Sequence, residues 1–247
     1  MKLMKKQIIF LMTIVLFLSS CSIDGGDFGD TSYGDSNSIN GSTSRFATYK
    51  NVMYTLDFNK IKIFSIDNPS DPILQNELTI NDELETITIY QNHIYVGARR
   101  GVYAVDITKP LNPIVSSSIE HWIAKDPIAI TGKYIYSTTR DFNTGRLTIY
   151  EDRTNGNFIE RNAIAIDQPY GIGIKDDFLF VCDDRNGIII FNITNRENPL
   201  EVATYPSITS PRDVIILGDI MICSAKNEFH LLDIKDPVHP KLVSIIQ

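Results

Sequence analysis

The fold is decided by a stretch that the chain repeats, Ile61-Lys-Ile-Phe-Ser-Ile-Asp-Asn-Pro-Ser-Asp-Pro72. An apolar run is followed by a polar turn that ends in proline. The same pattern returns at residues 102–113, 188–199 and 229–240. The last prolines of the four copies are 41, 86 and 41 residues apart, and 86 is two periods of 43. An internal repeat of about 42 residues is typical of proteins built from stacked supersecondary units.

Within one period the sequence predicts only strands. In residues 211–247 we expect strands at 213–217, 220–223, 229–234 and 242–246, joined by short turns. No stretch after residue 44 shows a sustained helical period of apolar residues. Middle strands of the repeat are apolar on both faces, so each must be covered on both sides by neighbouring units.

These units predict an all-β fold, a β-propeller of four-stranded antiparallel blades. A second series of prolines, Pro127, Pro169 and Pro211, recurs every 42 residues and supports this phase. Proline cannot donate to a strand ladder, so both series mark turns. We place five blades at about residues 45–80, 84–120, 126–165, 169–209 and 211–247.

The ends of the chain decide how such a ring closes. Blade one has a candidate innermost strand at 46–49, and blade five a candidate outermost strand at 242–246. We therefore expect the terminal blades to pack without a shared blade. Should the strand at 46–49 not form, the chain would be a partial ring or would pair with another copy. In blade three, Thr154-Asn-Gly-Asn157 replaces the proline turn.

The repeat resembles that of the LVIVD-repeat proteins, bacterial β-propeller-like proteins named for a strand such as Val102-Tyr-Ala-Val-Asp106. The asparagine–proline turn that follows belongs to the same pattern. The resemblance covers most of residues 50–247 and implies the fold. It implies little about activity, because most members look like surface or secreted proteins of unassigned function.

Residues 1–20 read as a lipoprotein signal peptide. Lys2, Lys5 and Lys6 precede an apolar run at 8–18, which is short for a membrane span and suits a secretory segment. The run ends in Leu18-Ser-Ser-Cys21, which looks like a bacterial lipobox. That resemblance implies cleavage before Cys21 and lipid attachment, including a palmitate-type acyl chain, at this residue. The alternative is an ordinary signal peptide with a chance cysteine.

Residues 21–44 predict a flexible tether, since they are almost all Gly, Ser, Asp and Asn. The acidic start of this segment resembles that of surface-exported lipoproteins, although a plain spacer fits as well. Ser22 after the cysteine resembles the outer-membrane sorting pattern. We therefore expect a protein held to the bacterial envelope by a lipid, at the outer membrane or exposed on the cell surface.

The net charge bears on the class of binding partner, and the cysteine spacing bears on disulfide formation. The net charge is −7, and it becomes −10 once the three lysines of residues 1–20 are removed, which argues against nucleic acid. Cys182 and Cys223 are 41 residues apart, so we expect equivalent sites in adjacent blades. Equivalent points on neighbouring blades lie too far apart for a disulfide, so buried unpaired thiols are expected.

We expect ligands at the face shared by the connections between blades and the second-to-third-strand turns. Aromatics and arginines dominate binding energy at such places. The candidate binding residues on this face are Trp122, Tyr170, Arg100, Arg185, Arg212 and Asp126. Trp122 could instead plug two blades. Arg99, Arg100, Arg140 and Arg185 could hold carboxylates with two parallel hydrogen bonds, or could be solvated turn charges.

Enzyme and cofactor motifs are not recognisable in the sequence. It has no HExxH, no GxSxG, no phosphate-binding loop and no GxGxxG, so we predict no catalytic set, metal or cofactor. Asp183 and Asp184 only faintly resemble a calcium loop or a glycosidase pair. We expect a non-catalytic module that binds or scaffolds protein or glycan. The alternatives are an envelope polysaccharide hydrolase or lyase that uses channel-mouth carboxylates, and an accessory subunit of an outer-membrane assembly.

Overall fold

The structure, a computed structural model, describes residues 41–120, 127–140, 144–153 and 157–247. These residues form twenty β-strands in five consecutive groups of four. Blade one holds β1 (Phe46–Tyr49), β2 (Val52–Asp57), β3 (Lys60–Ser65) and β4 (Ile73–Thr79). Blade two holds β5 (Leu84–Tyr90), β6 (His93–Ala98), β7 (Gly101–Asp106) and β8 (Ile114–Glu120).

The remaining three blades repeat this order. Blade three holds β9 (Ile128–Thr131), β10 (Tyr134–Arg140), β11 (Gly145–Arg153) and β12 (Asn157–Ile166). Blade four holds β13 (Pro169–Lys175), β14 (Phe178–Asp183), β15 (Gly187–Asn192) and β16 (Leu200–Tyr205). Blade five holds β17 (Asp213–Leu217), β18 (Ile220–Ser224), β19 (Phe229–Asp233) and β20 (Lys241–Ile246).

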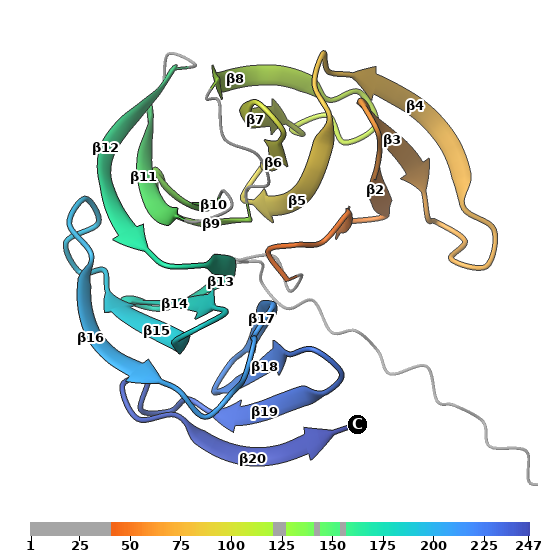
Figure 1. Cartoon of the computed structure of the whole chain (residues 1–247). Helices are drawn as coiled ribbons and strands as arrows, with labels where there is room; N and C mark the ends of the chain where they lie inside the picture. Colours follow the sequence, from red (N-terminus) through yellow and green to blue (C-terminus); the bar gives the residue numbers. More distant parts are fainter. Residues whose placement is uncertain (1–40, 121–126, 141–143, 154–156) are drawn as a thin grey trace, which may run out of the picture. The chain divides into compact units, whose positions relative to one another are not determined.

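The five blades are arranged in a ring around their first strands, as Figure 1 shows. Strands β1, β5, β9, β13 and β17 lie innermost, and consecutive ones contact each other from β1·β5 to β13·β17. The predicted five-bladed propeller is confirmed. The expected packing of blade one against blade five is not: among the described residues, the strand contacts that join the other neighbouring blades have no counterpart between these two. Within each blade the strands are antiparallel neighbours in sequence order, and no blade is shared between the two ends. The part of the chain that the structure describes contains no helix that could cross a membrane.

Each blade repeats the same backbone irregularity. The third and fourth strands slip register by one residue at an equivalent point, a β-bulge that strengthens the twist of the outer strand. The five slips lie between Ile63/Phe64, Ala104/Val105, Ile149/Tyr150, Ile190/Phe191 and Leu231/Leu232. Blade three has the longest outer strands, and β12 also touches β8 through a single parallel bridge.

Packing between blades uses both faces of the middle strands, as predicted. In β14, Leu179 and Val181 pack in a cluster with blade three, and Phe180 and Cys182 pack in a cluster with blade five. All four side chains are fully buried. Burial of side chains of this size stabilises the fold by about 1.5–3 kcal/mol each, which makes the interfaces between blades the main core.

Tyrosine hydroxyls link one blade to the next across these interfaces. The buried Tyr54 donates to the carbonyl oxygen of Pro110 at 2.9 Å, in the proline turn of blade two. Tyr136 of blade three donates in the same way to the carbonyl oxygen of Arg196 at 2.9 Å. Tyr95, 41 residues after Tyr54, reaches a carboxylate oxygen of blade three. The proline turns therefore cap the preceding blade in addition to reversing the chain.

The two buried cysteines do not occupy equivalent sites. Pairing aligns Ile172 with Val181 in blade four and Val214 with Cys223 in blade five, so Val181 is the counterpart of Cys223. The second strands of these two blades are 42 residues apart, and the period becomes 41 only after the shorter second-to-third-strand turn of blade five, so a spacing of 41 does not mark equivalent positions for the cysteines. Cys182 faces blade five and Cys223 faces blade four, within one cluster. Both thiols are buried and unpaired, as expected.

The described chain begins with a turn that joins the two ends of the ring. The Ser42 hydroxyl donates to Asp213 of blade five at 2.8 Å and accepts from the Ile172 amide of blade four at 2.8 Å. The Thr43 hydroxyl also donates to Asp213, at 2.6 Å. Residues 41–44, which the sequence places in the tether, therefore belong to the folded domain. The predicted tether up to residue 40 lies outside the described residues.

Candidate functional site

A pocket lies where the innermost strands of blades one to four begin. It has a volume of about 350 Å³ and opens on the predicted face of inter-blade connections and second-to-third-strand turns. We call it the central pocket. Residues that line it include Arg45, Glu83, Glu85, Pro127, Arg140 and Tyr170.

Two arginines converge on Tyr170, the first residue after Pro169 in the innermost strand of blade four. The guanidinium carbon of Arg140, at the end of β10, lies 3.7 Å from the Tyr170 ring centre. That of Arg212, just before β17, lies 4.0 Å away. The three residues come from the consecutive blades three, four and five, and Arg212 stacks on Tyr170 beside the residues that line the central pocket. Stacking of guanidinium groups on an aromatic face fixes their planes and their donors.

The hydrogen bonds of the two arginines leave donors free. Arg140 donates through Nη1 to the carbonyl oxygen of Pro169 at 3.2 Å. Arg212 Nη2 lies 3.1 Å from an Asp184 carboxylate oxygen. Nη1 of Arg212 is buried and has no hydrogen-bond partner among the described residues. A buried donor without an acceptor is costly, so this atom marks a place where a ligand oxygen would be favourable.

Electrostatics point the same way. Burial is the largest influence on Arg140 and lowers the pKa of its guanidinium. The charge of Arg212 lowers this pKa further, whereas Tyr170, Glu85 and Asp184 raise it. Two neighbouring cations that have lost part of their hydration are stabilised by an anion between them. The geometry and the charge together suit a planar carboxylate, which guanidinium groups bind with paired N–H donors.

The backbone of Gly171, beside the central pocket, lies very close to the backbone of residues 212 and 213. A Cβ atom on Gly171 would lie 2.6 Å from the Asp213 Cα and 2.8 Å from the Arg212 carbonyl oxygen. The close approach of β13 to the start of β17 therefore requires glycine next to Tyr170. This contact, together with the hydrogen bonds that Asp213 accepts from residues 42 and 43, holds Arg212 over the ring.

Arg100 lies in a separate pocket between blades one and two. Its backbone amide donates to Asp82 at 3.1 Å, and Nη2 donates to the Asn81 carbonyl oxygen at 2.5 Å. Asp82 also accepts from the buried Tyr103 hydroxyl at 3.1 Å. Arg100 thus belongs to a hydrogen-bonded turn on the same face as the central pocket, outside its lining.

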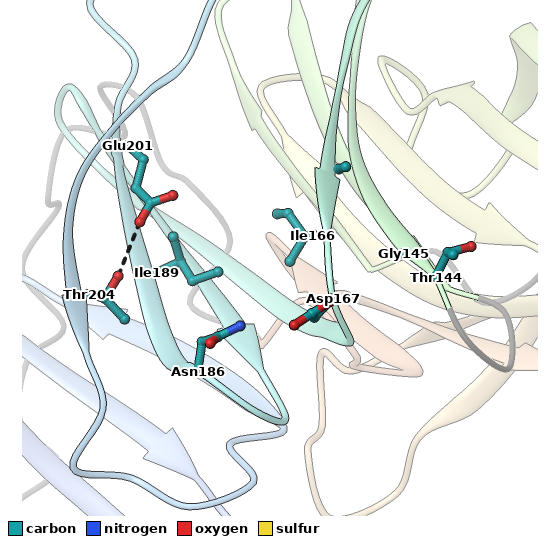
Figure 2. Close-up of a pocket in the computed structure, with 9 residues that line it drawn as sticks. Thr144, Gly145, Ile166, Asp167, Asn186, Ile189, Glu201 and Thr204 are labelled. Atoms are coloured by element: carbon teal, nitrogen blue, oxygen red, sulfur yellow. Dashed lines mark hydrogen bonds between the residues drawn. The ribbon is translucent and has the colours of Figure 1, made fainter.

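Arg185 lies beside a third pocket, between blades three and four. This cavity has a volume of about 450 Å³, and Asp167 and Asn186 line it. Figure 2 shows these two side chains and the hydrogen bond from Thr204 to Glu201. The Arg185 side chain is 61% exposed, and its Nη1 is 3.9 Å from Asp167. It is a solvated charge at the rim of this cavity.

Of the six predicted binding residues, the structure brings Tyr170 and Arg212 together. Trp122, Asp126 and the predicted lipid-attachment residue Cys21 lie outside the described residues. Sequence reasoning noted Arg140 among the turn arginines but did not assign it to the site. Arg140 reaches the site because the end of β10 lies beside the start of β13, where Arg140 bonds to Pro169. No local sequence motif signals this contact between blades.

The acidic pair of blade four has structural partners. Asp183 is fully buried and accepts from the amides of Gln168, Arg185 and Asn186, at 2.7, 3.0 and 2.8 Å. Its oxygens therefore shape the turn. Asp184 faces Arg212. Within the described ranges, no group of three or more His, Cys, Asp or Glu side chains could hold a metal ion.

Comparison with known families supports the repeat. Residues 170–206, which span blade four, match the model of the LVIVD repeat. Blade four is an LVIVD repeat. The predicted resemblance to LVIVD-repeat proteins is thereby confirmed, and the other four blades share the strand order and bulge of this LVIVD unit. A comparison of the sequence with curated proteins found no match.

Solved structures with a similar fold are propellers of low sequence identity. A functionally unknown protein from Desulfotomaculum acetoxidans shares 16% identity at a TM-score of 0.65, with 80% of this chain and 66% of that chain covered. The periplasmic gluconolactonase PpgL of Pseudomonas aeruginosa shares 9% at 0.59, with 79% and 67% covered. BamB of Moraxella catarrhalis shares 8% at 0.53, with 82% and 62% covered. This chain spans about two thirds of their length, and the likeness shows the fold alone.

Proposed function

We propose that this LVIVD-repeat propeller is a non-catalytic binding module of the bacterial envelope that holds an acidic group of a protein or glycan in the central pocket. The observation that carries the proposal is the arginine pair on Tyr170, with a buried Arg212 donor that has no partner among the described residues. A carboxylate would accept from this donor and would lie against both cations, of which Arg212 already has Asp184 on its other side.

The envelope address rests on the sequence. The segment that ends in Cys21 looks like a lipobox, and the polar residues after it suit a tether. A lipid on Cys21 would hold the propeller at a membrane, at the outer membrane or on the cell surface. The binding face would then be free to meet other envelope components.

The alternative is an envelope polysaccharide hydrolase or lyase. Its support is a fold shared with a gluconolactonase at 9% identity, together with Glu83 and Glu85 in the lining of the central pocket. Both carboxylates come from the start of blade two, whereas a catalytic pair flanking a sugar would be expected from different blades. Release of reducing ends from polygalacturonate incubated with the protein would favour this alternative.

The binding proposal is tested by the affinity of the full chain, in detergent solution, for two acidic polymers. Polygalacturonate represents a glycan and poly-L-glutamate a protein, and dextran serves as the neutral reference. We expect binding to at least one acidic polymer, and Arg212→Gln to weaken it about 30-fold, which corresponds to about 2 kcal/mol.

The matched control is Arg153→Gln. This arginine is 50% exposed and lies at the end of β11 that is distant from Arg140, so its loss removes the same charge away from the pocket. Binding of the control should equal that of the native chain. Equal weakening by both variants, or no preference for either acidic polymer over dextran, would rule out the central pocket as the site.

A further inference from the structure

Blade five has a sheet face that no other blade covers. In blades one to four the face directed toward the next blade is buried, as Tyr54, Tyr136 and Phe180 illustrate at 0% exposure. Strand pairing places Ile222 of blade five at the position of Phe180. Ile222 is only half-buried. Among the described residues, the strand contacts that join the other neighbouring blades are not found between blade five and blade one.

This face carries a cluster of apolar side chains, with Ser224, Asp233 and Ser244 at its margins. Pairing sets Ile215, Ile222 and Leu231 in one row across three strands. Phe229 and Ile246 form a second row beside it, and they are 51% and 55% exposed. Repeat proteins that end in solvent carry polar residues on the terminal face, and this terminal face does not follow that pattern.

The other end of the ring does follow it. On the free face of blade one, Lys62 takes the place that Ile189 has in blade four, and it forms an ion pair with Asp57 at 2.5 Å. Lys60 pairs with Glu77 at 2.5 Å on the same strands. Blade one therefore presents charges where blade five presents aliphatic side chains, so a blade-one face is a poor complement to it.

We propose that two copies of this chain associate through the free faces of blade five about a two-fold axis. The complement that fits an apolar blade face is another apolar blade face, and a second copy supplies one of identical extent. A two-fold arrangement makes such a surface self-complementary. Ile222 also lacks the hydroxyl with which Tyr54 and Tyr136 engage the turn of the next blade, so this face needs no hydrogen-bond acceptor from its partner.

The size of the face sets the strength of the contact. Four strands spaced about 4.8 Å apart and five residues long, with a rise of about 3.4 Å, present about 300 Å² in projection. A stable complex buries about 800 Å² on each partner. The dimer is therefore expected to dissociate on dilution.

Sedimentation velocity of the full chain in detergent solution, from about 1 to 100 μM, tests the proposal. We expect a shift from monomer to dimer across this range. Phe229→Glu places a charge in the second apolar row of the contact, beside Ile246, and should weaken dimerisation at least 10-fold. Its melting temperature should remain within a few degrees of the native value, because Phe229 is half exposed.

Leu200→Glu is the matched control. Leu200 is 66% exposed on the outer strand of blade four, so the same kind of change occurs away from the proposed contact. The control should dimerise like the native chain. A native chain that stays monomeric at 100 μM would overturn the proposal and would leave this face to a different occupant. Equal loss of dimer in both variants would also overturn it.

Discussion

At the scale of single residues, the packing of three consecutive blades creates the chemistry beside the central pocket. Arg140, Tyr170 and Arg212 are far apart in sequence and belong to three blades. Each is held by backbone contacts, with Arg140 bonded to Pro169 and Arg212 fixed by the tight approach of Gly171. The cost of holding two cations together is met by the fold, so the site is preorganised for an anion.

Glu151 gives a prediction about acid stability. This buried carboxylate accepts hydrogen bonds from Lys133 and Arg161, with the Arg161 Nε contact at 2.7 Å. These two bonds are the largest influences and lower the pKa of Glu151 from 4.5 to about 2. A depressed pKa in the folded state means that its stabilisation is present above pH 4.5 and is lost as the pH falls toward 2.

We therefore expect Glu151→Gln to melt at a lower temperature than the native chain at pH 7. The gap between the two should narrow as the pH is lowered from about 4.5 to about 2. Thermal melts across this range provide the measurement. Glu160→Gln, which removes an exposed charge on β12, is the control and should follow the native curve. A gap that does not change with pH would mean that the charge of Glu151 contributes nothing.

At the scale of elements, the proline turns have two tasks. They reverse the chain between the third and fourth strands. In blades two and four, a carbonyl oxygen of the turn also accepts a hydrogen bond from a buried tyrosine of the preceding blade. The hydroxyls of Tyr54 and Tyr136 are buried, and burial raises the pKa of both well above its usual value. Both hydroxyls are therefore protonated and can donate at neutral pH.

Tyr136→Phe should destabilise the fold without rearranging it. The change removes one buried hydrogen bond and leaves the Arg196 carbonyl oxygen without that donor, at a cost of about 1 kcal/mol. For a domain of this size that lowers the melting temperature by about 2–4 °C. Tyr205→Phe is the control, because the Tyr205 hydroxyl has no hydrogen-bond partner among the residues that the structure describes. This variant should melt within about 1 °C of the native chain. Equal melting of both variants would contradict the role of the tyrosine link.

The repeat allowed the strands and turns to be predicted, because alternation and proline act locally. The bulges and the tyrosine links depend on contacts between strands and blades, and no single period signals them. The spacing of Cys182 and Cys223 even misled, since it differs by one residue from the 42-residue period of the second strands, and an offset of one residue reverses the face that a strand position occupies. In the same way, Tyr170 and Arg212 could be assigned to one face, but their contact with Arg140 required the ring.

At the scale of the whole molecule, the lipid anchor gives an independent prediction. Cys21→Ser should abolish incorporation of a clickable palmitate analogue during growth, because the thiol that carries the diacylglycerol is gone. Cys182→Ser is the control, since that thiol is buried in the folded domain and should not affect labelling. Labelling of Cys21→Ser at the native level would show that the segment is an ordinary signal peptide.

The most direct test of the central claim is a crystal structure of the protein with trigalacturonate or a glutamate-rich peptide bound. We predict a ligand carboxylate over Tyr170, within hydrogen-bond distance of Arg212 Nη1 and the Arg140 guanidinium, with both arginines still stacked on the ring. A ligand bound only between blades, beside Arg100 or Arg185, would contradict the account. So would an arginine pair that stays free of ligand at saturating concentration.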